Sequence, residues 1–173
     1  MPGVDEPRTE VYRFRPVVVF AAAVAAILLQ VSLPLYLPLY PLFSLFELPL
    51  LVVIYFGFSR RNPTSGLLLG LVIGVAQDAL SYQPIGLFGM AKTLVGYAAS
   101  SLSSRIDTDP RPARLLLLFL FYHFHQLVYA GIERLLLGQP ADIVSLKVLE
   151  AALVNALLGV LVFHILDRFR QTT

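Results

Sequence analysis

Long apolar runs alternate with short segments that carry proline, glycine and charge, and this pattern repeats along the whole chain. An α-helix needs about 20 mainly apolar residues to cross the roughly 30 Å hydrocarbon core of a bilayer. The runs approach that length and are continuously apolar, as is typical of helices in lipid. We therefore predict an all-α integral membrane fold with six transmembrane helices, at about Pro16–Leu33, Leu42–Phe58, Ser65–Leu80, Gly86–Leu102, Ala113–Leu137 and Ile143–Leu166.

These runs fill most of the 173-residue chain, so no separate soluble domain is expected. We predict one six-helix domain at 16–166, flanked by an N-terminal tail at 1–15 and a C-terminal tail at 167–173. The first tail carries the acidic residues Asp5, Glu6 and Glu10, which argues against a secretory signal peptide.

Lysine and arginine are distributed unevenly among the segments that join the runs. Ten of the 13 lie in the two tails and in the second and fourth links. Arg134 and Lys147 lie near the fifth link, and Lys92 lies inside the fourth run. Because basic residues concentrate on the cytoplasmic side of membrane proteins, both termini are predicted to be cytoplasmic.

Composition agrees with a membrane protein. The chain is 57% hydrophobic and 14% charged, with a mean hydropathy of +0.76, whereas soluble domains carry about 25% charged residues. A net charge of +2, spread over several segments, argues against a nucleic-acid-binding surface. The chain has no cysteine, which excludes disulfides, thiolate metal sites and cysteine nucleophiles.

The first link, Leu33–Leu42, contains three prolines. Proline lacks the backbone N–H that a helix interior requires. We therefore expect a non-helical hairpin at the membrane interface here.

Glycine recurs every fourth residue in the third run, at Gly66, Gly70 and Gly74, and the series ends at Asp78. The fourth run carries Gly89 and Gly96. Residues four apart share one side of a helix, and small residues there allow two helix backbones to approach closely in lipid. The pattern predicts a tight helix contact, either within the chain or with a partner.

Asp78 and Lys92 lie inside these two runs, where a charge is costly unless it has a partner or lies near water. The turn between the runs is short, and a helical side chain leans towards the N-terminus of its own helix, so both groups have a similar depth. We predict that they form a buried polar pair, directly or through a water molecule.

Most other charged residues within the runs fall in the predicted outer halves. This clustering indicates a hydrated cavity or a partner surface that opens outward; the alternative is that each side chain simply lies at the membrane interface. The residues assigned to this outward polar cavity are Glu47, Gln126, Tyr129, Glu133 and Glu150.

The sequence contains no recognisable catalytic arrangement. His123 and His125 are two residues apart, so on a helix they point in different directions, whereas paired helical metal ligands are usually four apart. A phosphate-binding Gly-x-x-x-x-Gly-Lys motif is also missing. We expect no enzymatic activity, no metal and no cofactor.

Four short motifs resemble the bacterial rod shape-determining protein MreD family. They are Gly66-Leu-Leu-Leu-Gly70, Gly74-Val-Ala-Gln-Asp78, Pro84-Ile-Gly86-Leu87 and Leu94-Val-Gly96-Tyr97. The resemblance implies a non-catalytic scaffold in the bacterial inner membrane that helps organise lateral peptidoglycan synthesis. It further implies direct binding to MreC, and a complex that also contains MreB, the glycosyltransferase RodA and a class B penicillin-binding protein.

The same resemblance supplies an alternative function. The fold of the MreD family is similar to that of the substrate-binding subunits of energy-coupling-factor vitamin transporters. Those subunits dock through an Ala-x-x-x-Ala pattern on their first helix, which Ala21 and Ala25, and Ala22 and Ala26, reproduce here.

Overall fold

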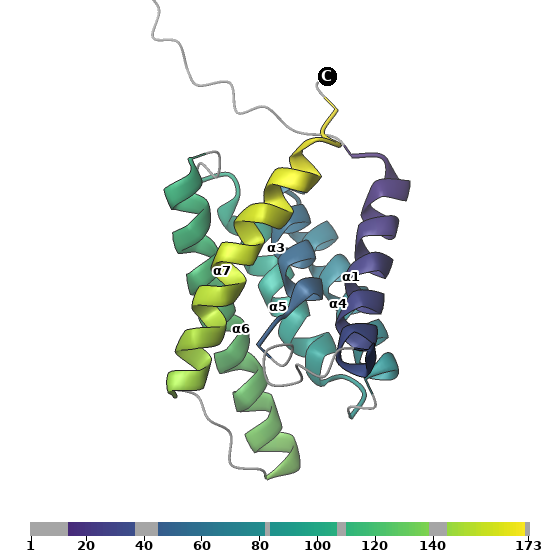
Figure 1. The fold of residues 1–173 in the computed structure, drawn as a ribbon, viewed down its shortest axis with the longest axis vertical. Coiled ribbons are helices and arrows are strands. Elements are labelled where there is room, and N and C mark those ends of the chain that lie inside the picture. Colours follow the sequence, from purple (N-terminus) through teal and green to yellow (C-terminus); the bar gives the residue numbers. More distant parts are fainter. Residues whose placement is uncertain (1–13, 37–44, 82–83, 107–109, 139–144, 172–173) are drawn as a thin grey trace, which may run out of the picture.

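The computed structural model describes residues 14–36, 45–81, 84–106, 110–138 and 145–171. These residues form six α-helices and no sheet, which confirms the predicted all-helical fold. Figure 1 shows the helices in one bundle in which successive helices run in opposite directions. The helices are α1 (Pro16–Tyr36), α3 (Leu48–Arg60), α4 (Pro63–Leu80), α5 (Leu87–Leu102), α6 (Arg111–Leu137) and α7 (Leu146–Asp167).

Four of the helices, α1, α4, α6 and α7, are long and apolar enough to cross a membrane, judged by length and composition. The other two are shorter, with 13 residues in α3 and 16 in α5. At 1.5 Å per residue these reach about 20 and 24 Å, less than the roughly 30 Å of a hydrocarbon core. The six predicted helices are therefore present, but two of them are shorter than a complete span.

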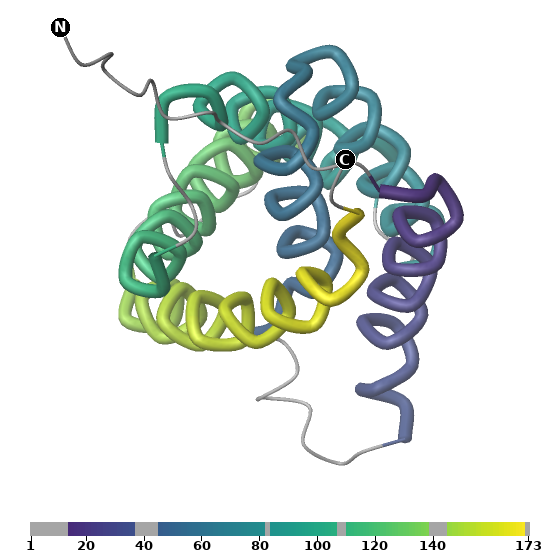
Figure 2. The backbone as a smooth tube through the Cα atoms, turned by 90° about the horizontal axis from the view of Figure 1, so that it is seen from above, coloured from purple at the N-terminus to yellow at the C-terminus, as the bar shows by residue number. Residues whose placement is uncertain are grey.

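The short helix α3 is the centre of the bundle. Every residue from Pro49 to Ser59 is buried, and all five other helices contact α3. Figure 2 shows it between α1 on one side and α6 and α7 on the other. A helix that is apolar on every side is expected to be buried on every side. Because its neighbours surround it, α3 does not need the length of a lipid-facing span.

Helices α4 and α5 form the most extensive pair in the bundle, and glycine lines their contact. A Cβ atom at Gly70 would overlap the backbone carbonyl of Lys92, and one at Gly74 would overlap the backbone of Phe88. Gly66 and Gly96 meet directly, so a Cβ on either would overlap the backbone of the other. The predicted glycine contact thus packs two helices of the same chain, and this internal packing covers the face that a partner would need.

Helix α3 begins later than predicted. It starts at Leu48, and residues 45–47 before it are not helical. Pro49 explains this start, because proline is favoured in the first helical turn, where its missing N–H has no intrahelical acceptor in any case.

Helix α1 continues to Tyr36, although we expected the chain to leave the helix at about Leu33. Pro34 lies in the last turn, where it removes one hydrogen bond but has a backbone angle that suits a helix. The helix therefore tolerates it for two further residues. The rest of the predicted proline-rich hairpin lies outside the described residues.

Candidate functional site

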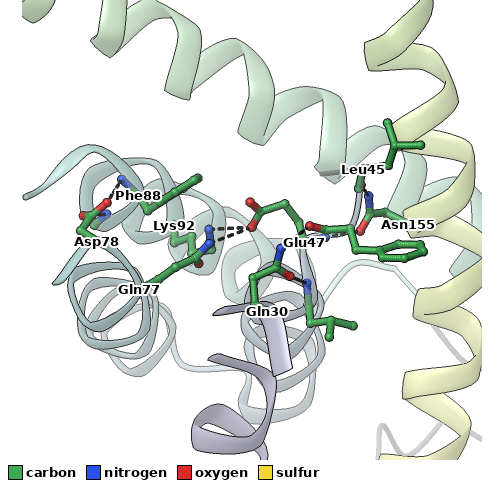
Figure 3. Close-up of polar contacts among 11 residues, drawn as sticks. Gln30, Leu45, Glu47, Gln77, Asp78, Phe88, Lys92 and Asn155 are labelled. Atoms are coloured by element: carbon green, nitrogen blue, oxygen red, sulfur yellow. Dashed lines mark hydrogen bonds and ion pairs between the residues drawn. The ribbon is translucent and has the colours of Figure 1, made fainter. Parts of the chain in front are cut away.

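Polar side chains gather inside the bundle at the end where α3 begins, which we call the Glu47 end (Figure 3). They come from α1, α4, α5, α7 and the residues before α3. Asp78, Lys92 and Asn155 have no solvent-exposed surface, and Gln77 is 2% exposed. The members of this polar network are Gln30, Glu47, Gln77, Asp78, Lys92 and Asn155.

Two amide side chains hold the non-helical backbone at residues 45–48. Gln30 of α1 donates a hydrogen bond to the Phe46 carbonyl (2.7 Å) and accepts one from the Leu48 N–H (3.0 Å). Asn155 of α7 accepts one from the Glu47 N–H (2.8 Å) and donates to the carbonyls of Leu45 (2.5 Å) and Ala151 (2.8 Å). Backbone groups that leave a helix inside a membrane protein must find such partners. The two amides therefore fix the position of Glu47.

Glu47 in turn neutralises a buried lysine. Its Oε2 atom lies 3.1 Å from Nζ of Lys92, whose side chain is completely buried, while the Glu47 side chain is 15% exposed. Nζ also lies 4.1 Å from the centre of the Phe88 ring, over its electron-rich face. Gln77 donates a longer bond of 3.5 Å to the same carboxylate oxygen. These contacts replace the water that the ammonium group loses on burial.

Asp78 caps helix α5 from the end of α4. Its carboxylate accepts hydrogen bonds from the N–H groups of Gly86 (2.8 Å), Phe88 (3.0 Å) and Gly89 (3.0 Å). The first N–H groups of a helix have no intrahelical acceptor, and the helix dipole favours a negative charge beside them. Gly86 has φ of +109°, a conformation that favours glycine. The aspartate thereby joins the two helices that glycine packs together.

Asp78 and Lys92 form no direct hydrogen bond or ion pair with each other, so the direct form of the predicted pair is not present. The form through a water molecule stays a prediction. Both side chains are fully buried on neighbouring helices, but Lys92 contacts Glu47, and Asp78 contacts backbone amides. The prediction considered only charged side chains within the two runs. It omitted the unpaired N–H groups at the start of α5, which offer Asp78 three hydrogen bonds.

The residues assigned to an outward polar cavity differ in burial and in their contacts. Glu47 belongs to the polar network, whereas Gln126, Tyr129 and Glu133 on α6 are half-buried and Glu150 on α7 is exposed. Within the described part of the chain, these last four form no hydrogen bond or ion pair with the network. A cavity that includes all five therefore remains a prediction.

Replacing Asp78 with asparagine is expected to lower the stability of the protein by about 2 kcal/mol, because hydrogen bonds to a charged acceptor are lost at a buried site. Glu150→Gln removes a carboxylate from an exposed position and is the matched control. Thermal unfolding of both variants in the same detergent measures the difference. Equal midpoints would show that the capping contact contributes nothing.

His125 lies beside the network and lacks hydrogen bonds. Its ring is 2% exposed and stacks on Phe88 and Tyr129, with centroid separations of 6.1 and 6.2 Å. Neither ring nitrogen has a partner, and neither does Oε1 of Gln77. The sequence placed His125 only at the border of a polar stripe, and it gave no sign that the ring would be buried against aromatic neighbours.

Phenylalanine at position 125 is expected to maintain or raise the unfolding temperature. It preserves the ring stacking and removes a buried unsatisfied group that costs about 1–3 kcal/mol. His125→Ala provides the comparison, because it deletes the ring as well and is expected to destabilise. A loss of stability in His125→Phe equal to that of His125→Ala would contradict this interpretation.

A second charged cluster lies at the opposite end of the bundle, which we call the Asp167 end. Asp167, the last residue of α7, accepts a hydrogen bond from the Tyr55 hydroxyl (2.9 Å). It also pairs with Arg114 of α6 (2.6 Å) and with Arg170 (2.8 Å). One carboxylate therefore connects α3, α6 and α7. Sequence reasoning missed this cluster because its partners are 112, 53 and 3 residues away along the chain.

Within the described residues, charged side chains hold helices together. Asp78 caps a helix, Lys92 is neutralised by Glu47, and Asp167 joins three helices. Within the same residues, no three histidine, aspartate or glutamate side chains are close enough to hold a metal ion. The arrangement is suited to fixing the relative positions of helices.

The chain matches one known protein family over most of its length. The model of a family described as rod shape-determining protein MreD matches residues 12–172. The chain belongs to the MreD family. The match covers all six helices, and it confirms the resemblance carried by the motifs of α4 and α5. No curated protein and no solved structure matches the chain.

Membership of the MreD family gives the network its context. The family is one of shape-determining membrane proteins, and four long apolar helices make this MreD protein a multi-pass membrane protein. The glycines and the aspartate of the MreD-like motifs pack and cap the pair formed by α4 and α5. In this protein, those motif residues build the scaffold of the bundle.

Proposed function

We propose that this MreD protein is a non-catalytic scaffold of the bacterial cell-wall elongation complex. It binds MreC in the cytoplasmic membrane and helps organise lateral peptidoglycan synthesis with MreB, RodA and a class B penicillin-binding protein. The family match over residues 12–172 carries the proposal.

The positions of the buried charged groups support a scaffold role. The ion pair of Glu47 and Lys92 and the capping contact of Asp78 lie between helices, where they fix the shape of the bundle. A rigid bundle presents a constant outer surface to a partner, which lowers the entropic cost of binding. The proposal assigns recognition to the outer faces of the helices and leaves the interior to maintain the fold.

The proposal also includes an orientation. Among the described residues, most arginines lie near the Asp167 end, next to the start of α1, after α7 and in the links before α4 and α6. Basic segments favour the cytoplasmic side. The Asp167 end therefore faces the cytoplasm in the proposal, and the Glu47 end, with its polar network, faces outward.

Co-purification tests the scaffold role. MreC and an affinity-tagged copy of this protein are produced in the same cells, solubilised in mild detergent and captured on the tag. We expect MreC to elute with the tagged protein and not with an unrelated six-helix membrane protein carrying the same tag. A tagged protein that is folded, judged by gel filtration and thermal unfolding, but elutes without MreC would contradict the proposal.

The same preparation tests the alternative function. A vitamin-binding subunit would bind its vitamin tightly as an isolated protein. We expect none of the water-soluble vitamins to raise the unfolding temperature of the purified protein. A clear stabilisation by one vitamin would overturn the scaffold role.

A further inference from the structure

An apolar groove lies between α1 and α7, with α3 as its floor. The groove has a volume of about 420 Å³. Helix α1 contacts α3 and α4 but not α7, so the groove is open between the two outer helices. It follows α1 from Val17 to Leu29 and ends on the other wall at Phe169.

Hydrocarbon is the material that this groove accommodates. Every lining residue is apolar, so a polar solute would lose its hydrogen bonds to water without replacement. Both walls of the groove are partly exposed: Val17 on α1 is 74% exposed, and Phe169 after α7 is 51% exposed. From Val17 to Leu29 the groove is about 18 Å long, and a helix of that length and about 10 Å across would occupy roughly 1,400 Å³. The groove therefore encloses an extended chain more completely than it encloses a helix.

Two arginines flank the groove at the Asp167 end. Arg15 directly precedes α1, whose first residues include the groove-lining Val17 and Val18. Arg168 directly precedes Phe169 at the end of α7. Both arginines are exposed, and both helix ends lie at the same end of the bundle (Figure 1). At this end of the bundle, an exposed arginine therefore adjoins each of the two helices that form the walls of the groove.

We propose that this groove binds one anionic phospholipid. One acyl chain lies along the alanine-rich face of α1 over α3, and the phosphate group lies between Arg15 and Arg168. Arginine is well suited to a phosphate because it forms two parallel charge-assisted hydrogen bonds. Basic sites between transmembrane helices favour anionic headgroups in the same way. This site is independent of the proposed binding of MreC.

Native mass spectrometry tests the site with phosphatidylglycerol and phosphatidylcholine of identical acyl chains. We expect the protein to retain one phosphatidylglycerol in preference to phosphatidylcholine. The double variant Arg15→Gln with Arg168→Gln should reduce this preference about tenfold. The matched control is Arg105→Gln with Arg111→Gln, which removes two exposed arginines that do not flank the groove. An equal reduction in both double variants would show only a generally basic surface and would overturn the proposal.

A second pair of variants tests the groove itself. Ala25→Phe fills the groove from an exposed position and should abolish retention of both lipids, while Val24→Phe, on another face of α1, should leave retention unchanged. Unfolding temperatures identify any variant that fails to fold. Soluble glycerol phosphate should not displace the bound lipid. Displacement would show that the site recognises the headgroup without the acyl chain, which would overturn the proposal. If Ala25→Phe prevents MreC binding but leaves lipid retention intact, the groove holds a partner helix and the proposal is wrong.

Discussion

Replacing Gly70 with alanine is expected to destabilise the protein by at least about 2 kcal/mol, because the added methyl group has no space. Its Cβ atom would overlap the carbonyl group of Lys92, which belongs to the backbone of α5 and cannot move alone. To relieve the overlap, α4 and α5 would have to separate along their common face. That separation would also disturb the contacts of Lys92 with Glu47 and of Asp78 with the start of α5.

The matched control is Gly131→Ala on α6, where an added Cβ atom has no neighbour within 4 Å. Alanine favours a helix over glycine by up to about 1 kcal/mol, so this variant should be neutral or slightly stabilising. Thermal unfolding of both variants in the same detergent measures the difference. If Gly70→Ala unfolds at the same temperature as Gly131→Ala, α4 and α5 do not pack as described.

Breaking the buried ion pair is expected to have the largest effect of any single change, because Glu47→Gln leaves Lys92 without a counterion in the interior. Removing one partner of a buried pair costs about 3–5 kcal/mol. Lys92→Met should cost less, since Glu47 is 15% exposed and can be hydrated. The double variant Glu47→Gln with Lys92→Met removes both charges of this pair and should recover most of the stability lost in Glu47→Gln.

Chemical or thermal unfolding of the three variants gives the coupling between the two positions. Contacting residues depart from additivity, whereas distant residues do not. Additive losses in the double variant would show that Lys92 and Glu47 act independently. As a further control, Asp167→Asn combined with Lys92→Met should be close to additive, because these two side chains lie at opposite ends of the bundle and have different partners.

The helices themselves follow from local patterns. The run at about Ser65–Leu80 corresponds to α4 at Pro63–Leu80, and the run at about Gly86–Leu102 corresponds to α5 at Leu87–Leu102. Glycine at every fourth position also predicts their close contact, because this spacing clears one continuous face of a helix. Such features depend on residues that are neighbours in the sequence, which is why they can be recognised there.

The partners of the buried charges depend on distant residues and could not be assigned in the same way. Glu47 reaches Lys92 only because α3 begins at Leu48 and because Gln30 and Asn155 hold the residues before it. Asn155 lies 108 residues from Glu47, and no local pattern indicates their contact. The sequence does contain one sign of such a contact, which is the isolated amide side chain of Asn155 in an apolar run. Polar groups inside membrane proteins generally have partners.

The proposed orientation places the polar network at the outer end of the bundle and the arginine-rich links in the cytoplasm. The chain contains no cysteine, so single cysteines can be introduced at the exposed positions Ser104, between α5 and α6, and Lys147, at the start of α7. Intact cells, or spheroplasts where an outer membrane is present, are treated with a membrane-impermeant maleimide. We predict that Lys147→Cys reacts in closed cells and that Ser104→Cys reacts only after the membrane is opened. Labelling of Ser104→Cys in closed cells, with Lys147→Cys protected, would contradict this orientation.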